Sequence, residues 1–325
     1  MSFGQIIGRQ DADALIPVET AGQIISATTR ASAALTLCRS ARMSAKVAKQ
    51  PVLSALPVAY WIAGDVGLKP PSSAAWDGVE LIAEEIAVLV PIPENVLLDS
   101  KFPIWDELRP AVAEAIAEKL DAAVLAGTEK PASWPQAIIP AARAAGNVVP
   151  IESSPAMGGI SNDLDELLGV VEDSGFDPTG FAARRSLRGL MRRARNAQGN
   201  RLVDMTSGNY LGLPISYPPG GALPDDVEAV SGAFDYAVVA TRQDLTYKIL
   251  DQAVISDADG KVVLNLAQQD SLALRVTARF AFAIATPVTR DAPGGAVPFA
   301  VLESSGDGSS TRTAAERKAP AAAKK

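Results

Sequence analysis

Histidine is absent from this 325-residue sequence, and cysteine occurs once, at Cys38. Without histidine the chain lacks the commonest general base and the commonest transition-metal ligand, which excludes Ser-His-Asp triads and histidine-based zinc sites. A single cysteine cannot form a disulfide within the chain, and this fits a reducing compartment. We interpret Cys38 as a small buried apolar residue.

Aromatic residues make up only 5% of the chain. No apolar run reaches the roughly 18 residues that a membrane helix needs, and residues 1–19 lack the basic and apolar segments of a signal peptide. Apolar residues still reach 48%, which predicts a packed core and argues against a disordered chain. The net charge of −7 argues against a protein that grips nucleic acid over its whole surface, but is compatible with one that encloses it.

Apolar spacing predicts a helix that begins at residue 20 and ends between residues 41 and 47, and further helices over residues 105–126, 163–173 and 181–197. The helix 105–126 is the clearest, because an apolar stripe runs along it and Gly127 stands where a C-terminal cap belongs. Pro110 either kinks this helix or marks its start near Arg109. Residues 130–155 are rich in Pro, Ala and Gly, and we interpret them as a connector.

Residues 57–62 and 76–92 are predicted to be the two strands of a projecting hairpin around a Gly- and Pro-rich loop. The C-terminal part is predicted to be rich in strands, over residues 234–241, 247–255, 261–267 and 272–284. Asp259-Gly260 forms a turn between two of them. No Walker loop and no Gly-x-Gly-x-x-Gly after a strand is present, so we expect no enzyme and no catalytic, cofactor-binding or metal-binding residues.

This order of elements resembles the HK97 family of phage major capsid proteins. The resemblance rests on several strings in one order: AYWIAGDVGLK (59–69), IAVLVPIPENVLLDS (86–100), LDAAVLAG (120–127), WPQAI (134–138), GLPIS (212–216) and GAFDYAVV (232–239). In WPQAI, Gln136 and Ala137 stand where the family usually has a glycine. The matches extend over residues 17–287, almost the whole chain that we expect to be ordered.

The resemblance implies an α+β fold of the HK97-like capsid type, with an N-terminal arm, an E-loop hairpin, a peripheral domain with a long spine helix, and an axial domain. The expected parts are residues 1–46 (arm and helix), 47–93 (E-loop), 94–149 (peripheral domain), 150–240 (axial domain), 241–303 (return strands) and 304–325, a flexible low-complexity tail.

Three residues of the E-loop are candidates for contacts between subunits: Trp61, Lys69 and Trp76. The two tryptophans either anchor the loop to a neighbour or pack on each other. Lys69 either forms an isopeptide bond, as a lysine does in some family members, or is a solvated loop residue. The six arginines within residues 184–195 either contact DNA phosphates or pair with Asp and Glu of neighbouring subunits.

The resemblance implies a structural protein that assembles as hexamers and pentamers into an icosahedral shell around double-stranded DNA. We expect it in the virion capsid, assembled in the host cytoplasm, with a portal protein, non-specifically bound DNA, and a scaffolding or decoration protein as optional partner. No membrane partner is expected. An encapsulin-type nanocompartment shell is the alternative, because it shares the fold and encloses enzymes in place of DNA.

Overall fold

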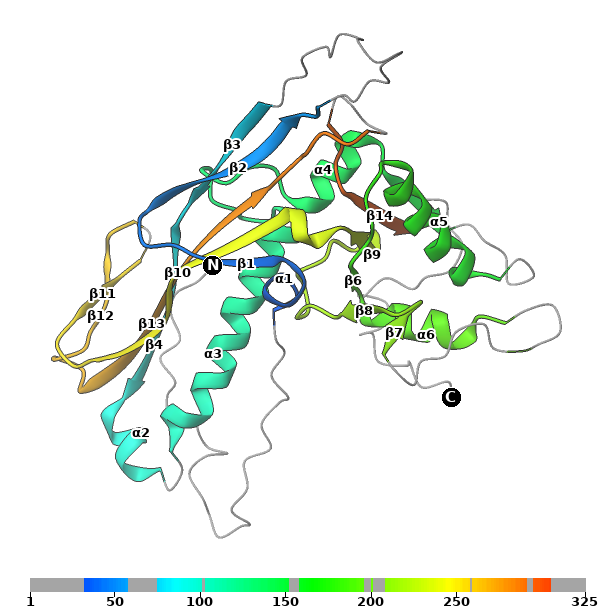
Figure 1. Ribbon diagram of the computed structural model, residues 1–325. Helices are drawn as coiled ribbons and strands as arrows, with labels where there is room; N and C mark the ends of the chain where they lie inside the picture. Colours follow the sequence, from blue (N-terminus) through cyan, green and yellow to red (C-terminus); the bar gives the residue numbers. More distant parts are fainter. Residues whose placement is uncertain are drawn as a thin grey trace, which may run out of the picture.

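The computed structural model describes residues 32–57, 75–100, 103–151, 158–195, 200, 208–257, 259–290 and 295–304. Figure 1 shows two sheets side by side, with a long helix beside the first and a hairpin that projects beyond it. The first sheet has four strands in the order β1-β10-β13-β4. Its strands are β1 (Arg39–Arg42), β10 (Ala237–Leu250), β13 (Ser271–Ile284) and β4 (Glu84–Pro93).

The long helix α3 (Ile104–Asp121) packs against this sheet because both elements present apolar side chains to each other. Alternate residues of β13, among them Val276, Phe280 and Phe282, are buried on the face toward the helix. A π-helical turn, η1 (Ala122–Ala126), continues α3, and Gly127 ends it with a φ of +76°. The sequence prediction for this helix is confirmed, and Pro110 lies inside it.

The second sheet has six strands in the order β5-β14-β9-β6-β8-β7. They are β5 (Val148–Ile151), β14 (Phe299–Ser304), β9 (Val227–Gly232), β6 (Gly180–Ala183), β8 (Leu213–Ser216) and β7 (Asn209–Tyr210). The helices α5 (Ile160–Asp173) and α6 (Arg185–Arg193) share one hydrophobic cluster with this sheet. The helix α4 (Ile138–Ala145) contacts β14 and belongs to the larger cluster around α3.

A single core joins the two sheets. The strand β9 leads through one 3-10 turn, η3 (Phe234–Tyr236), directly into β10. Phe234 is fully buried and lies edge-on to Phe299 of β14, with ring centroids 5.4 Å apart. The same cluster contains Phe282 of the first sheet. The two sheets therefore pack into one hydrophobic interior.

Smaller elements extend from this body. The hairpin of β2 (Val47–Ala55) and β3 (Ala75–Ile82) is a separate two-stranded sheet. A second short hairpin joins β11 (Val254–Ser256) and β12 (Val262–Asn265), and Gly260 has a φ of +80° in its turn, as Asp259-Gly260 predicts. The short helices are α1 (Ala33–Leu37) and α2 (Glu94–Asp99).

The predicted helix over residues 20–47 is wrong in its second half. Only α1 is helical among its described residues, and Arg39–Arg42 form the strand β1, parallel to β10. The helical spacing ends at Cys38, and hydrogen bonding to β10 determines the conformation of the residues that follow. Residues 1–31 of the expected arm and helix (1–46) lie outside the described residues, as does the tail after Ser304.

The predicted helix over residues 181–197 begins later than expected. Phe181, Ala182 and Ala183 are buried within β6, between β9 and β8, and the helix α6 starts at Arg185. A short run of buried apolar residues has the same appearance in a central strand and in a buried helix, so periodicity alone could not separate the two.

The predicted connector over residues 130–155 contains the helix α4 and the strand β5. Pro140 is the third residue of α4, in the first turn, where a missing N–H is tolerated. The predicted strand 76–92 is two strands, because the pairing changes at Ala83 from β2 to β13. The predicted strand 57–62 lies, apart from Pro57, outside the described residues, and β2 ends before it.

Candidate functional site

The projecting hairpin carries the one predicted contact residue that the structure describes. Trp76 is the second residue of β3, pairs with Leu53 of β2, and leaves 68% of its surface exposed. Tryptophan is rarely so exposed in a folded protein. Trp61 and Lys69 lie outside the described residues. The assignment of all three to subunit contacts, and the alternative packing of the two tryptophans, remain predictions.

The hairpin is buried only at its base. There Leu81 and Ala83 pack with Met43 against the outer side of β10 and β13, at Val238 and Ala281. Farther out, β3 is exposed from Ala75 to Gly78. An isolated two-stranded hairpin is only marginally stable in water. The outer part of this hairpin therefore offers backbone and side chains to another molecule.

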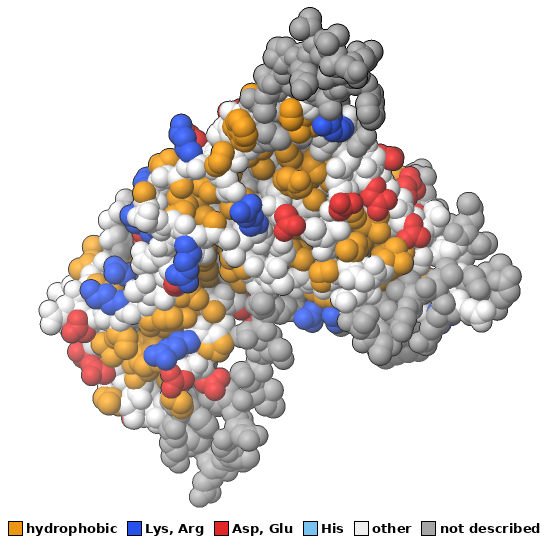
Figure 2. Space-filling view, viewed as in Figure 1, with side chains coloured by type: hydrophobic (Ala, Val, Ile, Leu, Met, Phe, Trp, Pro, Cys, Tyr) orange, Lys and Arg blue, Asp and Glu red, His pale blue; other side chains and the backbone are white. Residues whose placement is uncertain are grey.

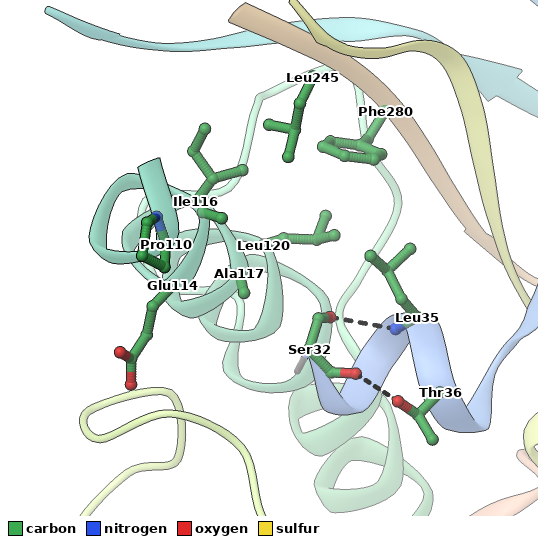
Figure 3. Close-up of a pocket in the computed structure, with 11 residues that line it drawn as sticks. Ser32, Leu35, Thr36, Pro110, Glu114, Ile116, Ala117, Leu120, Leu245 and Phe280 are labelled. Atoms are coloured by element: carbon green, nitrogen blue, oxygen red, sulfur yellow. Dashed lines mark hydrogen bonds between the residues drawn. The ribbon is translucent and has the colours of Figure 1, made fainter. Parts of the chain in front are cut away.

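An open groove lies between α1, α3 and the strands β10 and β13, and Figure 3 shows its lining. Its volume is about 630 Å³. Leu35, Ile116, Leu120, Leu245 and Phe280 form an apolar floor. Of the residues that line the groove, only Glu114 is charged. The groove can accept an apolar side chain and offers no pair of groups for acid–base chemistry.

One buried carboxylate holds α1 against the end of α3. Asp121 is fully buried and accepts hydrogen bonds from Ser32 Oγ at 2.5 Å, Ala33 N at 2.8 Å and Ala34 N at 2.9 Å. Burial raises the pKa of Asp121, and these three hydrogen bonds partly oppose the rise. The contact fixes the first described residues of the chain to the body.

Sequence reasoning missed this contact, although one signal was present. Asp121 is the only charged residue in the apolar run 120–127, and a lone charge in such a run requires a partner when it is buried. Cys38 lies nearby, and burial together with the charge of Asp121 raises the pKa of its thiol. The structure confirms the interpretation of Cys38 as a buried apolar residue.

The outer half of β10 is an exposed sheet edge. The strand β1 pairs with β10 only as far as Thr241, so residues 243–250 pair with β13 alone among the described residues. Leu245, Tyr247 and Ile249 are exposed along this edge. The guanidinium carbon of Arg109 lies 5.7 Å from the centre of the Tyr247 ring. An edge of this kind can pair with a strand of another chain.

Among the described residues, no group of acidic or cysteine side chains is placed to hold a metal ion. None of the described helices combines the length and apolar character that crossing a membrane requires. The described chain instead offers an exposed hairpin, a groove and a sheet edge on a packed body, which are features of a protein that contacts other chains.

Comparisons with known proteins agree with this arrangement. The model of the Phage capsid family matches residues 12–288. The major capsid protein of Staphylococcus phage 80alpha is 26% identical over 234 residues, which cover 70% of this chain and 69% of the relative. A solved structure from Microbacterium phage Oxtober96 is 34% identical, with a TM-score of 0.77, and covers 93% of this chain and 100% of its own.

A solved structure from Mycobacterium phage Adephagia is 29% identical, with a TM-score of 0.79, and covers 93% of this chain and 99% of its own. The capsid of a native GTA particle has the same fold at 14% identity and a TM-score of 0.64. These findings support a phage shell over the encapsulin-type alternative. The chain therefore belongs to the phage capsid family, with an α+β fold of the HK97-like type and the structural role of a major capsid protein in a virion.

Proposed function

We propose that copies of this chain assemble as hexamers and pentamers, and that these close into an icosahedral shell around the phage double-stranded DNA. The observation that carries the proposal is the β2–β3 hairpin, which projects from the body with Trp76 exposed at 68%. In a ring of copies this hairpin reaches a neighbour, and its apolar surface is then buried.

The remaining exposed apolar surface supports the same proposal. The sheet edge of β10 and the β11–β12 hairpin expose Tyr247, Ile249, Val254 and Val262. Apolar side chains gathered at one end of a molecule mark a contact surface. Figure 2 shows apolar side chains grouped at the lower left of this face, where Figure 1 places these strands. Many weak contacts of this kind, repeated by symmetry, stabilise a closed shell.

The proposal includes partners and a place of assembly. A portal protein occupies one vertex of the shell. Assembly takes place in the host cytoplasm, with a scaffolding or decoration protein as an optional partner. The DNA is bound non-specifically, through its phosphates, and the net charge of −7 does not favour a tight grip on them over the whole surface. The parts assigned to residues 47–93, 94–149 and 150–240 would then be the E-loop, the peripheral domain and the axial domain.

The test is to express the full chain alone and to measure particle mass by light scattering and shape by negative-stain electron microscopy. We expect closed shells or rings of five and six copies. A monomer at every salt and protein concentration, both alone and when co-expressed with the neighbouring structural genes of its phage, would overturn the proposal. Native particles that contain double-stranded DNA would separate a phage shell from an enzyme compartment.

A further inference from the structure

The helix α6 carries a strongly basic face. Leu187 and Met191 are buried against the six-stranded sheet, and the arginines lie on the opposite side. Four of them are exposed: Arg185, Arg188, Arg192 and Arg193. None of the four forms an ion pair with any carboxylate that the structure describes. No described carboxylate therefore neutralises this charge, although Arg192 and Arg193 lie in the last turn of α6, where the helix dipole favours cations.

The spacing of these arginines is unfavourable within a single chain. Arg185 and Arg188 are three residues apart, and Arg188 and Arg192 are four apart, so like charges lie next to each other on the helix surface. Arg188 lies 4.0 Å above the ring of Tyr217, and Arg192 donates a hydrogen bond to the carbonyl of Arg188. These contacts hold the guanidinium groups in place without neutralising them. A face of this kind is complementary to an anionic partner.

The helix α5 has the opposite character. Asp165, Glu166, Glu172 and Asp173 are exposed, and the helix contains no lysine or arginine. Glu172 and Asp173 lie in its last turn, where the negative end of the helix dipole makes a carboxylate unfavourable. Neither of them forms an ion pair with a described residue. Figure 2 shows acidic side chains grouped at the right, where Figure 1 places α5.

The helices α5 and α6 share one hydrophobic cluster on the six-stranded sheet and contact each other, but they lie toward different ends of its strand order. The helix α5 contacts β5, β14 and β9, and Tyr210 of β7 donates a hydrogen bond to its Asp165, whereas α6 contacts β9. Figure 1 shows α5 above and α6 below the middle strands of this sheet. In a ring, each copy presents one side to the preceding copy and the other side to the next, so different surfaces of the same chain meet.

We propose that the arginine face of α6 on one copy binds the acidic face of α5 on the neighbouring copy around the ring. This inference rests on the proposed assembly into rings, and it names the surfaces that meet there. The partner of the arginine face is a second copy of this chain. Each helix then receives the counter-charge that it lacks in the single chain.

The test uses charge reversal in the full-length protein. One variant carries Glu172→Arg and Asp173→Arg, and a second carries Arg185→Glu and Arg192→Glu. The third combines all four changes, which restores complementary faces and leaves the net charge as it was. The assembled fraction of each is measured by sedimentation and electron microscopy, and circular dichroism checks that each variant is folded.

We expect each double variant to lower the assembled fraction by roughly tenfold or more, because like charges then face each other, and the fourfold variant to recover it. Normal assembly of both double variants would overturn the inference, as would a folded fourfold variant that fails to recover. Normal assembly of the Arg185→Glu, Arg192→Glu variant together with reduced DNA content would assign the arginine face to DNA instead. If the unchanged chain forms no rings, the proposed function fails and not the α5–α6 contact. This result is obtained before any variant is made.

A second measurement does not depend on closed shells. Asp173→Cys and Arg188→Cys are introduced into separate chains, which are mixed and oxidised, while the native Cys38 is buried and does not compete. We expect a disulfide-linked dimer from the mixture and none from either variant alone. Absence of the linked dimer in samples that do contain rings would contradict the proposed contact.

Discussion

At the scale of single residues, Asp121 determines how the start of the described chain is attached. Its two oxygens accept three hydrogen bonds from the first residues of α1, and its side chain has no access to water. Asp121→Asn keeps the shape but places an N–H₂ group where one of these oxygens accepts. We expect a loss of about 1–3 kcal/mol in the free energy of unfolding, measured by urea denaturation of the unassembled chain.

The effect of Asp121 also depends on pH. Because burial raises its pKa above 3.8, the native state keeps a proton that the unfolded chain has already released. The stability that Asp121 contributes is therefore greatest below pH 3.8 and falls as the pH rises through its native pKa. The advantage of the native chain over Asp121→Asn should therefore shrink as the pH rises above 3.8.

The control for this residue is Asp244→Asn. Asp244 is exposed and forms only a loose ion pair with Arg42, at 3.5 Å. This change should alter the stability by less than about 0.5 kcal/mol. A difference between native protein and Asp121→Asn that stays constant across the pH range would contradict the role given to burial.

At the scale of elements, Gly232 limits how closely β9 and β14 approach. A Cβ at this position would lie 2.3 Å from the carbonyl oxygen of Pro298 and 2.9 Å from Phe299 Cα, which are backbone atoms that cannot move aside. Gly232→Ala should therefore cost about 1–3 kcal/mol or more in the free energy of unfolding. Thermal and urea denaturation would measure this loss of stability.

Gly169 in α5 provides the matched control for that substitution. A Cβ there meets nothing within 4 Å, and alanine is the better helix former. Gly169→Ala should raise the stability by about 0.5–1 kcal/mol. If Gly232→Ala and Gly169→Ala changed the free energy of unfolding equally, Gly232 would not be as tightly packed as the structure indicates.

Elements with a strong local pattern could be predicted from the sequence, and those determined by distant pairing could not. The helix that ends at Gly127 and the alternation in β13 follow from their own residues. The strand β1 exists because Arg39–Arg42 pair with residues about 200 positions later, and no local pattern indicates this. Asp121 was missed for the same reason, because its partners lie 87 to 89 residues away.

At the scale of the whole molecule, the exposed Trp76 should matter for assembly and not for folding. Trp76→Ala should leave the unfolding free energy within about 0.5 kcal/mol of the native value. It should weaken assembly by roughly tenfold or more, since buried aromatic anchors dominate interfaces. Light scattering would measure the concentration at which particles form, which should rise in Trp76→Ala. Trp76→Phe should assemble nearly as well as the native protein.

The opposite pattern would assign Trp76 to the hairpin itself. If Trp76→Ala lowers the stability of the single chain and leaves assembly unchanged, the tryptophan packs within its own molecule. That outcome would favour contact between Trp61 and Trp76 over contact with a neighbour.

The join between the two sheets has a mechanical consequence. The strand β9 continues through four residues into β10, and Phe234 at this join is buried in a core that both sheets share. Because both sheets contribute side chains to this core, a force on one sheet passes to the other through buried contacts at the join. A shell built from such copies would resist the outward pressure of its contents as a set of stiff plates, and would deform first at the seams between them.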